Sequence, residues 1–395
     1  MAAGSGRFPE LLIIGAGITG LALAWRFRQL YPDASVSVID KEPDVAMHAS
    51  GRNSGVLHAG FYYSSDSLKA RLCRQGNAQL QAFCREHELK LKVCGKLVVT
   101  RDASELPRLQ RLYHQGLANG VEVQLIDEAE VRELEPNART HGQALLSPNT
   151  ASVDPIEICQ FLKRELEAAG VRFFFETAYQ GRRRRQILTS RGVFEPGRCV
   201  NAAGLYADKI ARDFGFGLRY TLLPFKGLYL ACEGDERMLT RHVYPVPDPR
   251  QPFLGVHYTR TVDDHLKLGP TALPAFWREN YSGFSNFALN ELLEVLWYEG
   301  CLFLTNSFGF RQLALQEVRK VSRRYMAHQA AALTTRPPAR LGGFLKPGIR
   351  AQLLEKSSLK LVQDFVIEGD AFSTHVLNAV SPAFTCGLAF ADHLL

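Results

Sequence analysis

Apolar and polar positions along the first forty residues follow a pattern that predicts a β-α-β unit. Leu11 to Ile14 is a continuous apolar run with the length of a buried strand. Residues 18–30 have the apolar spacing of a helix, and residues 35–40 form a second strand-like run. Because parallel strands need a crossover connection, we expect both strands to lie parallel in one sheet.

The rest of the chain predicts alternating helices and strands, followed by a strand-rich region. Asp154 starts one helix as its cap, with Pro155 in the first turn and Glu157 three residues after the cap. We expect helices at 67–87, 105–119, 127–135, 155–170 and 206–214, and strands at 96–100, 171–175 and 198–201. Between 221 and 269 short apolar runs at 227–230, 244–247 and 253–256 alternate with turns, which is typical of an antiparallel sheet. Residues 284–333 again have a helical pattern, and the segment 378–395 reads as a loop that ends in a helix.

This change of pattern predicts an α/β (α+β) fold with two lobes, and 395 residues are enough for both. We expect a Rossmann-type lobe that is discontinuous in sequence and a second lobe built on the antiparallel sheet. The first comprises residues 8–90, 150–215 and 340–395, and the second comprises residues 91–149 and 216–339.

The composition is that of a globular protein, with 46% hydrophobic and 22% charged residues. The net charge of +7 suits an anionic ligand, an acidic membrane surface or nucleic acid without choosing among them. The basic run 182–185 precedes a strand-like segment, so we expect a solvated hairpin tip, with a phosphate or lipid contact as the alternative. It lacks interleaved aromatic residues, and we therefore expect no nucleic-acid partner.

The eight cysteines are scattered, with no C-x-x-C pair and no zinc-ligand spacing. We expect reduced thiols and no metal site. No secretory or transit signal and no run of about 18 apolar residues is visible. A cytoplasmic location is the expectation, with peripheral contact at the inner membrane left open. For residues 289–304 we expect burial against the other lobe, with docking on lipid as the alternative.

A glycine-rich turn between the first strand and the first helix predicts a dinucleotide site. Gly15, Gly17 and Gly20 form a G-x-G-x-x-G sequence, and Asp40 ends the second strand 20 residues later. These glycines give a tight turn, a close backbone approach to the pyrophosphate and close helix packing. The helix N-terminus would face the phosphates, and Asp40 would accept from ribose hydroxyls. The fingerprint serves NAD and FAD alike.

The loop 50–63 favours FAD, because small residues with polar neighbours suit a backbone that passes a pyrophosphate and a flat ring. An ordinary surface loop would not explain the histidine and the two tyrosines at its end. The candidate cofactor-binding residues are therefore the three glycines and Asp40 with Lys41, Ser50, Asn53, Ser54, Gly55 and Gly204.

Short motifs along the whole chain resemble the L-2-hydroxyglutarate dehydrogenase family. They include residues 54–60 (SGVLHAG), 94–97 (CGKL), 224–227 (PFKG), 244–249 (YPVPDP), 253–257 (FLGVH), 269–272 (GPTA), 348–352 (GIRAQ) and 378–382 (NAVSP). That family belongs to the D-amino-acid-oxidase-like flavoproteins, which hold FAD across a Rossmann-type lobe and bind substrate under an antiparallel sheet.

The resemblance implies oxidation of an (S)-2-hydroxy acid to 2-oxoglutarate, with the C2 hydride passing to flavin N5. It also implies a quinone or another electron acceptor reached by membrane association. A last flavin contact is implied in the segment 378–385, with Ser381 and Thr385 as candidates.

A dicarboxylic hydroxy acid needs a fixed cation and a proton acceptor. Arg350 is the first candidate for the carboxylate, with a structural salt bridge as the alternative, and Lys226 is the second, where the family usually carries arginine. His58 and His257 compete for the role of base. The candidate hydrogen-bond donors to a carboxylate are Tyr62 and Tyr244.

Three other functions stay open. A related flavoenzyme would act on another 2-hydroxy acid, an amino acid or glycerol phosphate. A flavin-binding protein without turnover would sense redox state or bind nucleic acid through its basic surface, and an NAD-dependent dehydrogenase would carry no flavin. Covalent attachment of FAD and the oligomeric state are not decided by the sequence.

Overall fold

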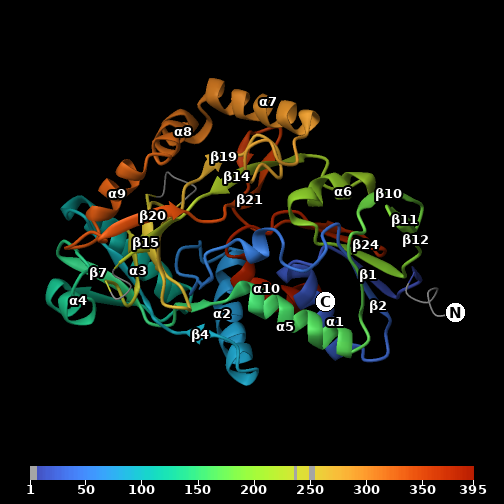
Figure 1. The fold of residues 1–395 in the computed structure, drawn as a ribbon, viewed down its shortest axis with the longest axis horizontal. Coiled ribbons are helices and arrows are strands. Elements are labelled where there is room, and N and C mark those ends of the chain that lie inside the picture. Colours follow the sequence, from blue (N-terminus) through green and yellow to red (C-terminus); the bar gives the residue numbers. More distant parts are fainter. Residues whose placement is uncertain (1–6, 235–237, 249–253) are drawn as a thin grey trace. The chain divides into compact units, whose positions relative to one another are not determined.

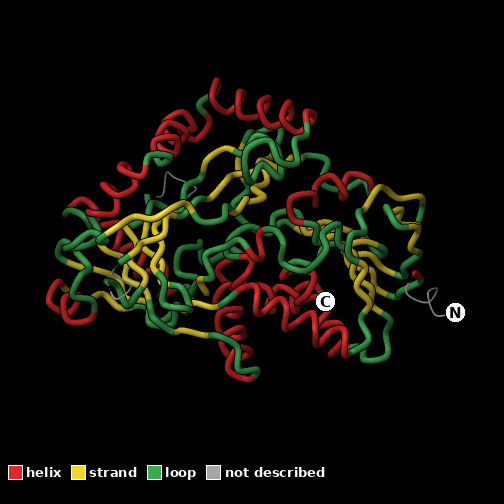
Figure 2. Tube along the Cα trace, viewed as in Figure 1, coloured by secondary structure: helices red, strands yellow, loops and turns green. Residues whose placement is uncertain are grey.

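The computed structural model describes residues 7–234, 238–248 and 254–395, which form two compact units (Figures 1 and 2). Unit 1 comprises the described residues through Asn53 together with Pro155–Pro224 and Arg350–Leu395. Unit 2 comprises Ser54–Asp154 and the described residues of Phe225–Ile349. The chain passes between the units within β14 (Tyr220–Gly227) and β21 (Gly348–Glu355).

Unit 1 is built on a mainly parallel sheet, as the β-α-β pattern predicts. Its described strands have the order β23-β24-β13-β1-β2-β9. The central strand β1 (Leu11–Ile14) pairs in parallel with β2 (Val36–Ile39) and β13 (Arg198–Asn201), and all four of its residues are buried. The outer strands are β9 (Arg172–Phe174), β24 (Ser373–Val376) and the antiparallel β23 (Ile367–Gly369). The Rossmann-type expectation is confirmed.

Helix α1 (Ile18–Leu30) coincides with the predicted helix and packs against α10. Their approach is close, because a Cβ atom on Gly387 would lie 2.8 Å from Cγ1 of Ile18. The other helices of unit 1 are α5 (Pro155–Ala168), α6 (Ala207–Asp213), α10 (Ala383–Leu394) and the short η2 (Ala49–Gly51) and η4 (Gly204–Tyr206).

The basic run lies at a hairpin tip, as predicted. Strands β10 (Tyr179–Arg183) and β11 (Gln186–Thr189) pair in antiparallel fashion around Arg184, whose φ is 56°, and β12 (Gly192–Phe194) follows. Arg184 and Arg185 are exposed, which agrees with a solvated tip.

Unit 2 contains a large, mostly antiparallel sheet whose described strands have the order β20-β15-β18-β17-β16-β5-β7-β6. Only the β16–β5 pair among these is parallel. The bounds are β5 (Lys96–Val99), β6 (Gln124–Asp127), β7 (Gln143–Ser147), β15 (Leu230–Glu233), β16 (His242–Pro245), β17 (His257–Arg260), β18 (Leu266–Gly269) and β20 (Arg340–Phe344). The antiparallel second lobe is thereby confirmed.

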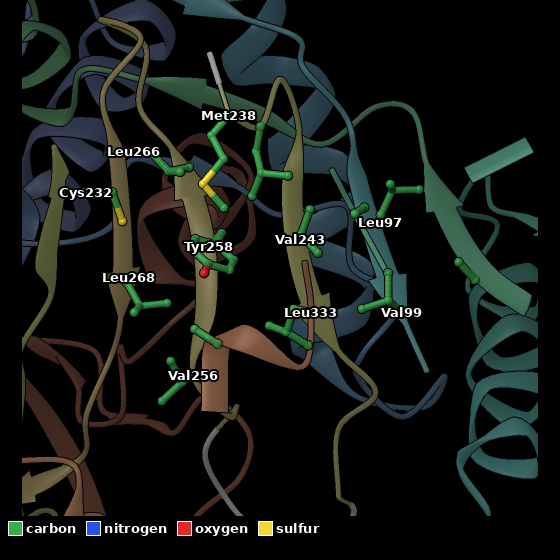
Figure 3. Packing of buried hydrophobic residues seen from close by; sticks show 14 of the residues in the cluster. Leu97, Val99, Cys232, Met238, Val243, Val256, Tyr258, Leu266, Leu268 and Leu333 are labelled. Carbon is green, nitrogen blue, oxygen red and sulfur yellow. The ribbon is translucent and has the colours of Figure 1, made fainter. Parts of the chain in front are cut away.

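The two faces of this sheet differ sharply in chemistry because successive side chains of a strand point to opposite sides. One face forms a hydrophobic cluster around Leu97, Val243 and Tyr258, seen in Figure 3. The alternate positions on the same strands carry a polar set, which we call the polar face: Lys96, His242, Tyr244, His257, Thr259 and Lys267.

The helices of unit 2 begin where the sequence provides caps. The Ser67 side chain accepts from the Ala70 N–H at the start of α2 (Leu68–Glu86), and Asp127 with Glu130 forms a capping box on α4 (Glu128–Leu134). The others are η3 (Ala103–Glu105), α3 (Leu106–Ala118), α7 (Leu289–Thr305), η5 (Ser307–Gly309), α8 (Phe310–Arg319) and α9 (Arg323–Ala331). No helix of the described residues is long and apolar enough to cross a membrane.

Short strands complete the two units. In unit 2, β8 (Ala151–Val153) pairs with β3 (Val56–Leu57) and β4 (Leu91–Lys92), and β19 (Leu273–Pro274) pairs with β14. In unit 1, β22 (Lys360–Leu361) pairs with β21.

Several sequence expectations differ from the structure. Residues 150–154 and 340–349 cluster with unit 2 and residues 216–224 with unit 1, and the strand expected at 227–230 is divided between the end of β14 and the start of β15. Residues 54–90 cluster with unit 2 instead of the first lobe, because β3 pairs with β8 and the Asn77 amide donates to the Leu57 and Asn149 carbonyls. The strand expected at 253–256 does not form over 254–256, and residue 253 lies outside the described residues; β17 begins at His257. The stretch 289–304 lies in α7, which carries several exposed apolar side chains.

Candidate functional site

The glycine turn after β1 has the geometry that the dinucleotide fingerprint requires. Gly15 has a φ of +112°, and a Cβ atom there would lie 2.5 Å from the Ala202 carbonyl oxygen. A Cβ atom on Gly20 would lie 2.0 Å from the Gly15 carbonyl oxygen. Neither position can hold a side chain without backbone movement, so the turn and the first contact of α1 depend on glycine.

The N-terminus of α1 is open to an anion. Gly17 is its N-cap and has no side chain to cap the helix, and no acidic residue lies in the first turn. The Ile18 N–H donates to Ser50 Oγ at 2.9 Å, and a Cβ atom on Gly17 would lie 3.0 Å from that oxygen. Backbone N–H groups and a positive end of the helix dipole are the usual features of a phosphate site.

The Asp40 carboxylate lies beside the glycine turn at the end of β2. Its Oδ2 accepts from the Ala16 N–H at 2.7 Å, and its Oδ1 accepts from the Glu42 N–H at 2.9 Å. Burial raises the pKa of Asp40, opposed by these two hydrogen bonds. A carboxylate oxygen can accept more than one hydrogen bond, so Asp40 can hold the turn and still accept from a ribose hydroxyl.

The other cofactor candidates of unit 1 have structural contacts of their own. Lys41 bonds to Glu42 and lies 5.6 Å from the ring centroid of Tyr206. The Asn53 amide donates to the Ser50 carbonyl at 2.7 Å, which fixes the loop that supplies the Ser50 hydroxyl. Gly204 has a φ of +52°, with open space where a Cβ atom would stand.

The remaining cofactor candidates lie around the start of α10 in unit 1 and at the first residues of unit 2. Thr385 is buried in the first turn of α10, and Ser381 is exposed just before that helix. Ser54 and Gly55 fall at the start of unit 2, where the Gly55 carbonyl accepts from the Val153 N–H. The glycine turn, the open end of α1 and the Asp40 carboxylate together fit the ADP half of a dinucleotide.

A second group of chemistry-bearing side chains lies on the polar face of unit 2. The rings of Tyr244 and His257 stack with centroids 3.6 Å apart. His257 Nδ1 lies 2.8 Å from the Gly255 carbonyl oxygen, so the neutral ring donates from Nδ1 and keeps Nε2 as an acceptor. Burial, and after it the charge of Lys96, lowers the pKa of His257 well below its ordinary value.

His58 is a second neutral imidazole of this group. It follows β3, and its carbonyl accepts from the Asn77 amide and the Cys73 thiol, each at 3.2 Å. Burial lowers the pKa of His58 well below its ordinary value, with Lys96 and His242 as further causes. His58 is also among the causes that lower the pKa of His257, so the two candidate bases lie near each other.

His242 has a structural role on the same face. Its Nδ1 accepts from the Arg260 N–H at 3.2 Å, which leaves Nε2 to donate to Cys94 Sγ at 3.3 Å. Burial lowers the pKa of His242 as well. Its two nitrogens are both occupied within the sheet, which distinguishes it from His257.

Lys96 is a member of this group that the sequence analysis did not single out. It is the first residue of β5 and is fully buried, and its Nζ has no hydrogen-bond partner among the described residues. The Nζ lies 4.2 Å from the Tyr244 ring centroid and 5.2 Å from the Tyr62 ring centroid. Burial lowers the pKa of Lys96 to about 7. A charged residue at the start of the apolar run Leu97–Val99 is the signal that could have identified it.

The predicted tyrosines belong to this group, and the predicted cations lie on β14 and β21. Burial raises the pKa of Tyr62, and no described residue pairs with its hydroxyl. Lys226 is half-buried and donates to Asn280 Oδ1 at 3.1 Å, and burial lowers its pKa. Arg350 is half-buried in β21 and belongs to unit 1.

Comparison with known proteins gives consistent matches over most of the chain. Residues 10–336 match the model of the FAD dependent oxidoreductase (DAO) family. The mitochondrial L-2-hydroxyglutarate dehydrogenase of Bos taurus is 34% identical over 412 residues, covering 97% of this chain and 87% of the bovine protein. L-2-hydroxyglutarate dehydrogenase of Escherichia coli K12 is 30% identical, covering 98% of this chain and 92% of its own.

Solved structures share the fold at low sequence identity. L-α-glycerophosphate oxidase of Mycoplasma pneumoniae, solved with FAD bound, has a TM-score of 0.71 at 19% identity and covers 98% of this chain and 93% of its own. Glycine oxidase of Geobacillus kaustophilus has a TM-score of 0.68 at 18% identity, with coverage of 98% and 94%. These likenesses establish the fold alone. Oxidases that act on different substrates share this fold, so the likenesses do not identify a substrate.

Proposed function

The chain belongs to the FAD-dependent oxidoreductase family, whose cofactor is FAD, and from this premise we propose that it oxidises L-2-hydroxyglutarate to 2-oxoglutarate. Relatives that carry this activity in their names align over nearly the whole chain at 30–35% identity. The observation that carries the proposal is His257, a buried neutral imidazole whose Nε2 is preset as a proton acceptor. Oxidation of a hydroxy acid requires such an acceptor.

His257 accepts the substrate hydroxyl proton in this proposal. Bound FAD supplies the acceptor for the hydride that leaves C2. His257 takes the proton on Nε2, and the Nδ1–H bond to the Gly255 carbonyl then stabilises the resulting cation. His58, the second neutral imidazole, lies in the same group and is the other candidate base.

Arg350, Lys226 and the tyrosines are the proposed substrate contacts. A guanidinium can hold a carboxylate through two parallel hydrogen bonds, and the two phenols can each donate one. The proposed cofactor contacts are the glycine turn with Asp40, Lys41, Ser50, Asn53, Ser54, Gly55, Gly204, Ser381 and Thr385.

Anaerobic reduction of the purified flavoprotein tests the activity, its substrate and its chirality together. We expect L-2-hydroxyglutarate to bleach the flavin and D-2-hydroxyglutarate to leave it oxidised. Glycerol phosphate, lactate and glycine serve as the other arms. If one of these reduces the flavin and L-2-hydroxyglutarate does not, the chain is a related flavoenzyme with another substrate. A protein that no donor reduces would be a flavin-binding protein without turnover.

Substitution of the histidines tests the assignment of the base. We expect His257→Gln to slow flavin reduction by roughly 100-fold or more. Glutamine is polar and of similar size, but it has no basic nitrogen and cannot accept the proton. His58→Gln is the matched variant; if only this variant loses the reductive step, His58 is the base and His257 supports it.

We further propose a quinone-type electron acceptor and peripheral contact with a membrane through α7. Exposed apolar side chains recur on one side of this helix at Leu289, Leu293, Trp297 and Leu304, which are 58%, 59%, 68% and 76% exposed. Phe284, just before the helix, is 84% exposed. Exposed apolar surface of this kind marks interaction sites, and amphipathic helices with aromatic residues bind the lipid interface.

Basic residues on the two helices that follow α7 suit an anionic bilayer. Arg311 and Arg319 on α8 and Arg323 and Arg324 on α9 are exposed. We expect the protein to co-float with anionic phospholipid vesicles and a Leu293→Gln, Trp297→Gln double variant to remain soluble with full flavin content. Equal flotation of both proteins would remove α7 as the contact.

A further inference from the structure

The buried amine of Lys96 is a polar group that the fold alone leaves unsatisfied. Its side chain has no exposed surface, and among the described residues nothing accepts a hydrogen bond from Nζ. An isolated ammonium in such surroundings is costly unless an anion pairs with it. An aliphatic side chain of similar length could fill this space without that cost. The other residues of β5, Leu97–Val99, are all aliphatic.

Among the residues that the structure describes, the groups that face Lys96 come from several elements of unit 2 and include no carboxylate. Tyr244 lies under the amine, with Phe61 and Tyr62 as further aromatic neighbours. The titratable neighbours are Cys73 of α2, Cys94 before β5, His58 after β3, His242 of β16 and His257 of β17. The histidines are neutral at pH 7, because burial lowers their pKa values.

The Lys96 amine and the Tyr62 hydroxyl are two buried donors on neighbouring side chains. The Tyr62 hydroxyl also lacks a partner among the described residues, and its ring centroid lies 5.2 Å from Nζ. A carboxylate has two oxygens that each accept hydrogen bonds, and an ammonium with a phenol is a suitable donor pair for it. Tyr244, which contacts both Nζ and the His257 ring, places this donor pair on the same face as the proposed base.

We propose that Lys96 is a carboxylate-binding residue of the substrate site, which pairs as an ammonium with the bound anion and is assisted by the Tyr62 hydroxyl. The ligand class is a 2-hydroxy or 2-oxo carboxylate. The inference rests on the proposed function for the identity of that acid, but not for its anionic chemistry. Arg350 and Lys226 remain the cations proposed for the second carboxylate of a dicarboxylic acid.

Binding through Lys96 has a thermodynamic signature, because burial lowers its pKa to about 7 in the unliganded protein. Above that pH the amine is mostly neutral, and an anion must bind together with one proton. The dissociation constant then rises about tenfold for each pH unit above about 7. The histidines stay neutral and the tyrosines protonated between pH 7 and 9, so they do not contribute to this slope. Burial lowers the pKa of Lys267, on the same face, to about 8, so the slope is assigned to Lys96 by its loss in Lys96→Arg.

The test is anaerobic titration of the FAD-loaded protein with 2-oxoglutarate from pH 6.5 to 9, followed by the flavin absorbance and by calorimetry in two buffers. For the wild type we expect the pH slope described above and uptake of about one proton at pH 8.5. Lys96→Arg keeps its charge at every pH, so we expect binding without slope or proton uptake. For Lys96→Met we expect roughly 10- to 100-fold weaker binding at pH 6.5, again without a slope.

Two controls make each outcome decisive. Lys90→Met removes an exposed lysine that pairs with Asp263, and it should bind as the wild type does. Flavin content and circular dichroism show whether Lys96→Met folds, and Lys96→Arg carries the test if it does not. A wild-type dissociation constant that is flat from pH 7 to 9 overturns the proposal, and so does wild-type affinity in Lys96→Met.

The same titrations distinguish a failure of the proposed function from a failure of the Lys96 assignment. If 2-oxoglutarate does not bind but pyruvate or glyoxylate binds with a slope that Lys96→Arg abolishes, Lys96 is a carboxylate site of an enzyme with another substrate. If L-2-hydroxyglutarate reduces the flavin while 2-oxoglutarate binding is independent of Lys96, the function stands and the assignment of Lys96 is wrong.

Discussion

Replacing Lys96 by methionine is expected to stabilise unit 2 at neutral pH, because it removes a buried amine from an interior strand of the sheet. Methionine retains an unbranched side chain of similar length. The pKa of Lys96 falls from 10.5 to about 7 because burial penalises the ammonium. At about 1.36 kcal/mol for each pKa unit, the penalty on the charged folded state is about 5 kcal/mol.

The pH dependence of this effect has a defined sign. Between pH 7 and 10.5 the unfolded chain binds a proton at Lys96 that the folded protein does not, so wild-type stability rises with pH over this window. The advantage of Lys96→Met is therefore largest below pH 7, where the whole penalty is present. It shrinks by about 1.36 kcal/mol for each pH unit above 7 and is nearly gone by pH 10.5.

Denaturant unfolding of the FAD-saturated wild type and Lys96→Met, without a carboxylate ligand, measures the difference in their free energies of unfolding. Trp277 and Trp297 belong to unit 2 and Trp25 belongs to unit 1, so tryptophan fluorescence follows unit 2 in a Trp25→Phe background shared by all variants, and far-UV circular dichroism follows the whole chain. The exposed Lys90→Met variant should show no such pH trend. A Lys96→Met protein that is less stable than the wild type, or whose advantage is equal at pH 7 and pH 10, would refute the reasoning.

Three further substitutions have expected outcomes. Gly17→Ala brings a methyl group to 3.0 Å from Ser50 Oγ at the open end of α1; we expect at least tenfold weaker FAD binding, and retention of FAD on gel filtration would contradict it. Asn77→Ala removes the amide that holds the His58 carbonyl, so we expect a loss of about 1–3 kcal/mol in denaturant unfolding and slower flavin reduction; an unchanged rate would separate this contact from catalysis. Asp127→Ala removes the cap of α4; it should cost about 1 kcal/mol with kcat unchanged, and a fall in kcat would show an unexpected link to the site.

Local signals in the sequence predicted the elements that depend on them. Helix α1 begins and ends where its apolar spacing does, and Ser67 caps α2 at the predicted start. The glycine turn with Asp40 could be recognised for the same reason, because its contacts lie within one strand–helix–strand unit. Such features are determined by neighbours in sequence, and the pattern of a single segment contains them.

Features that depend on pairing between distant segments could not be predicted from the pattern of a single segment. Residues 54–90 were expected in the first lobe, but β3 pairs with β8 almost a hundred residues later in the chain. Lys96 was overlooked because its environment arises only when β5 lies beside β16, which aligns it with His242. The contact between His257 Nδ1 and the Gly255 carbonyl forms where β17 begins. The strand expected at 253–256 placed Gly255 inside a strand, so the sequence pattern did not predict this contact.

The polar face also determines the pH range in which the proposed chemistry can operate. Burial lowers the pKa of His257 well below its ordinary value, so this base stays unprotonated even in mildly acidic solution. Burial also lowers the pKa of Lys96 to about 7, so the amine is mostly charged only below that pH. The free enzyme then has both groups in the required state only between these two pKa values, and kcat/KM should decline above about pH 7. A bound carboxylate stabilises the ammonium and raises the pKa of Lys96, so the decline in kcat must lie at higher pH than the decline in kcat/KM.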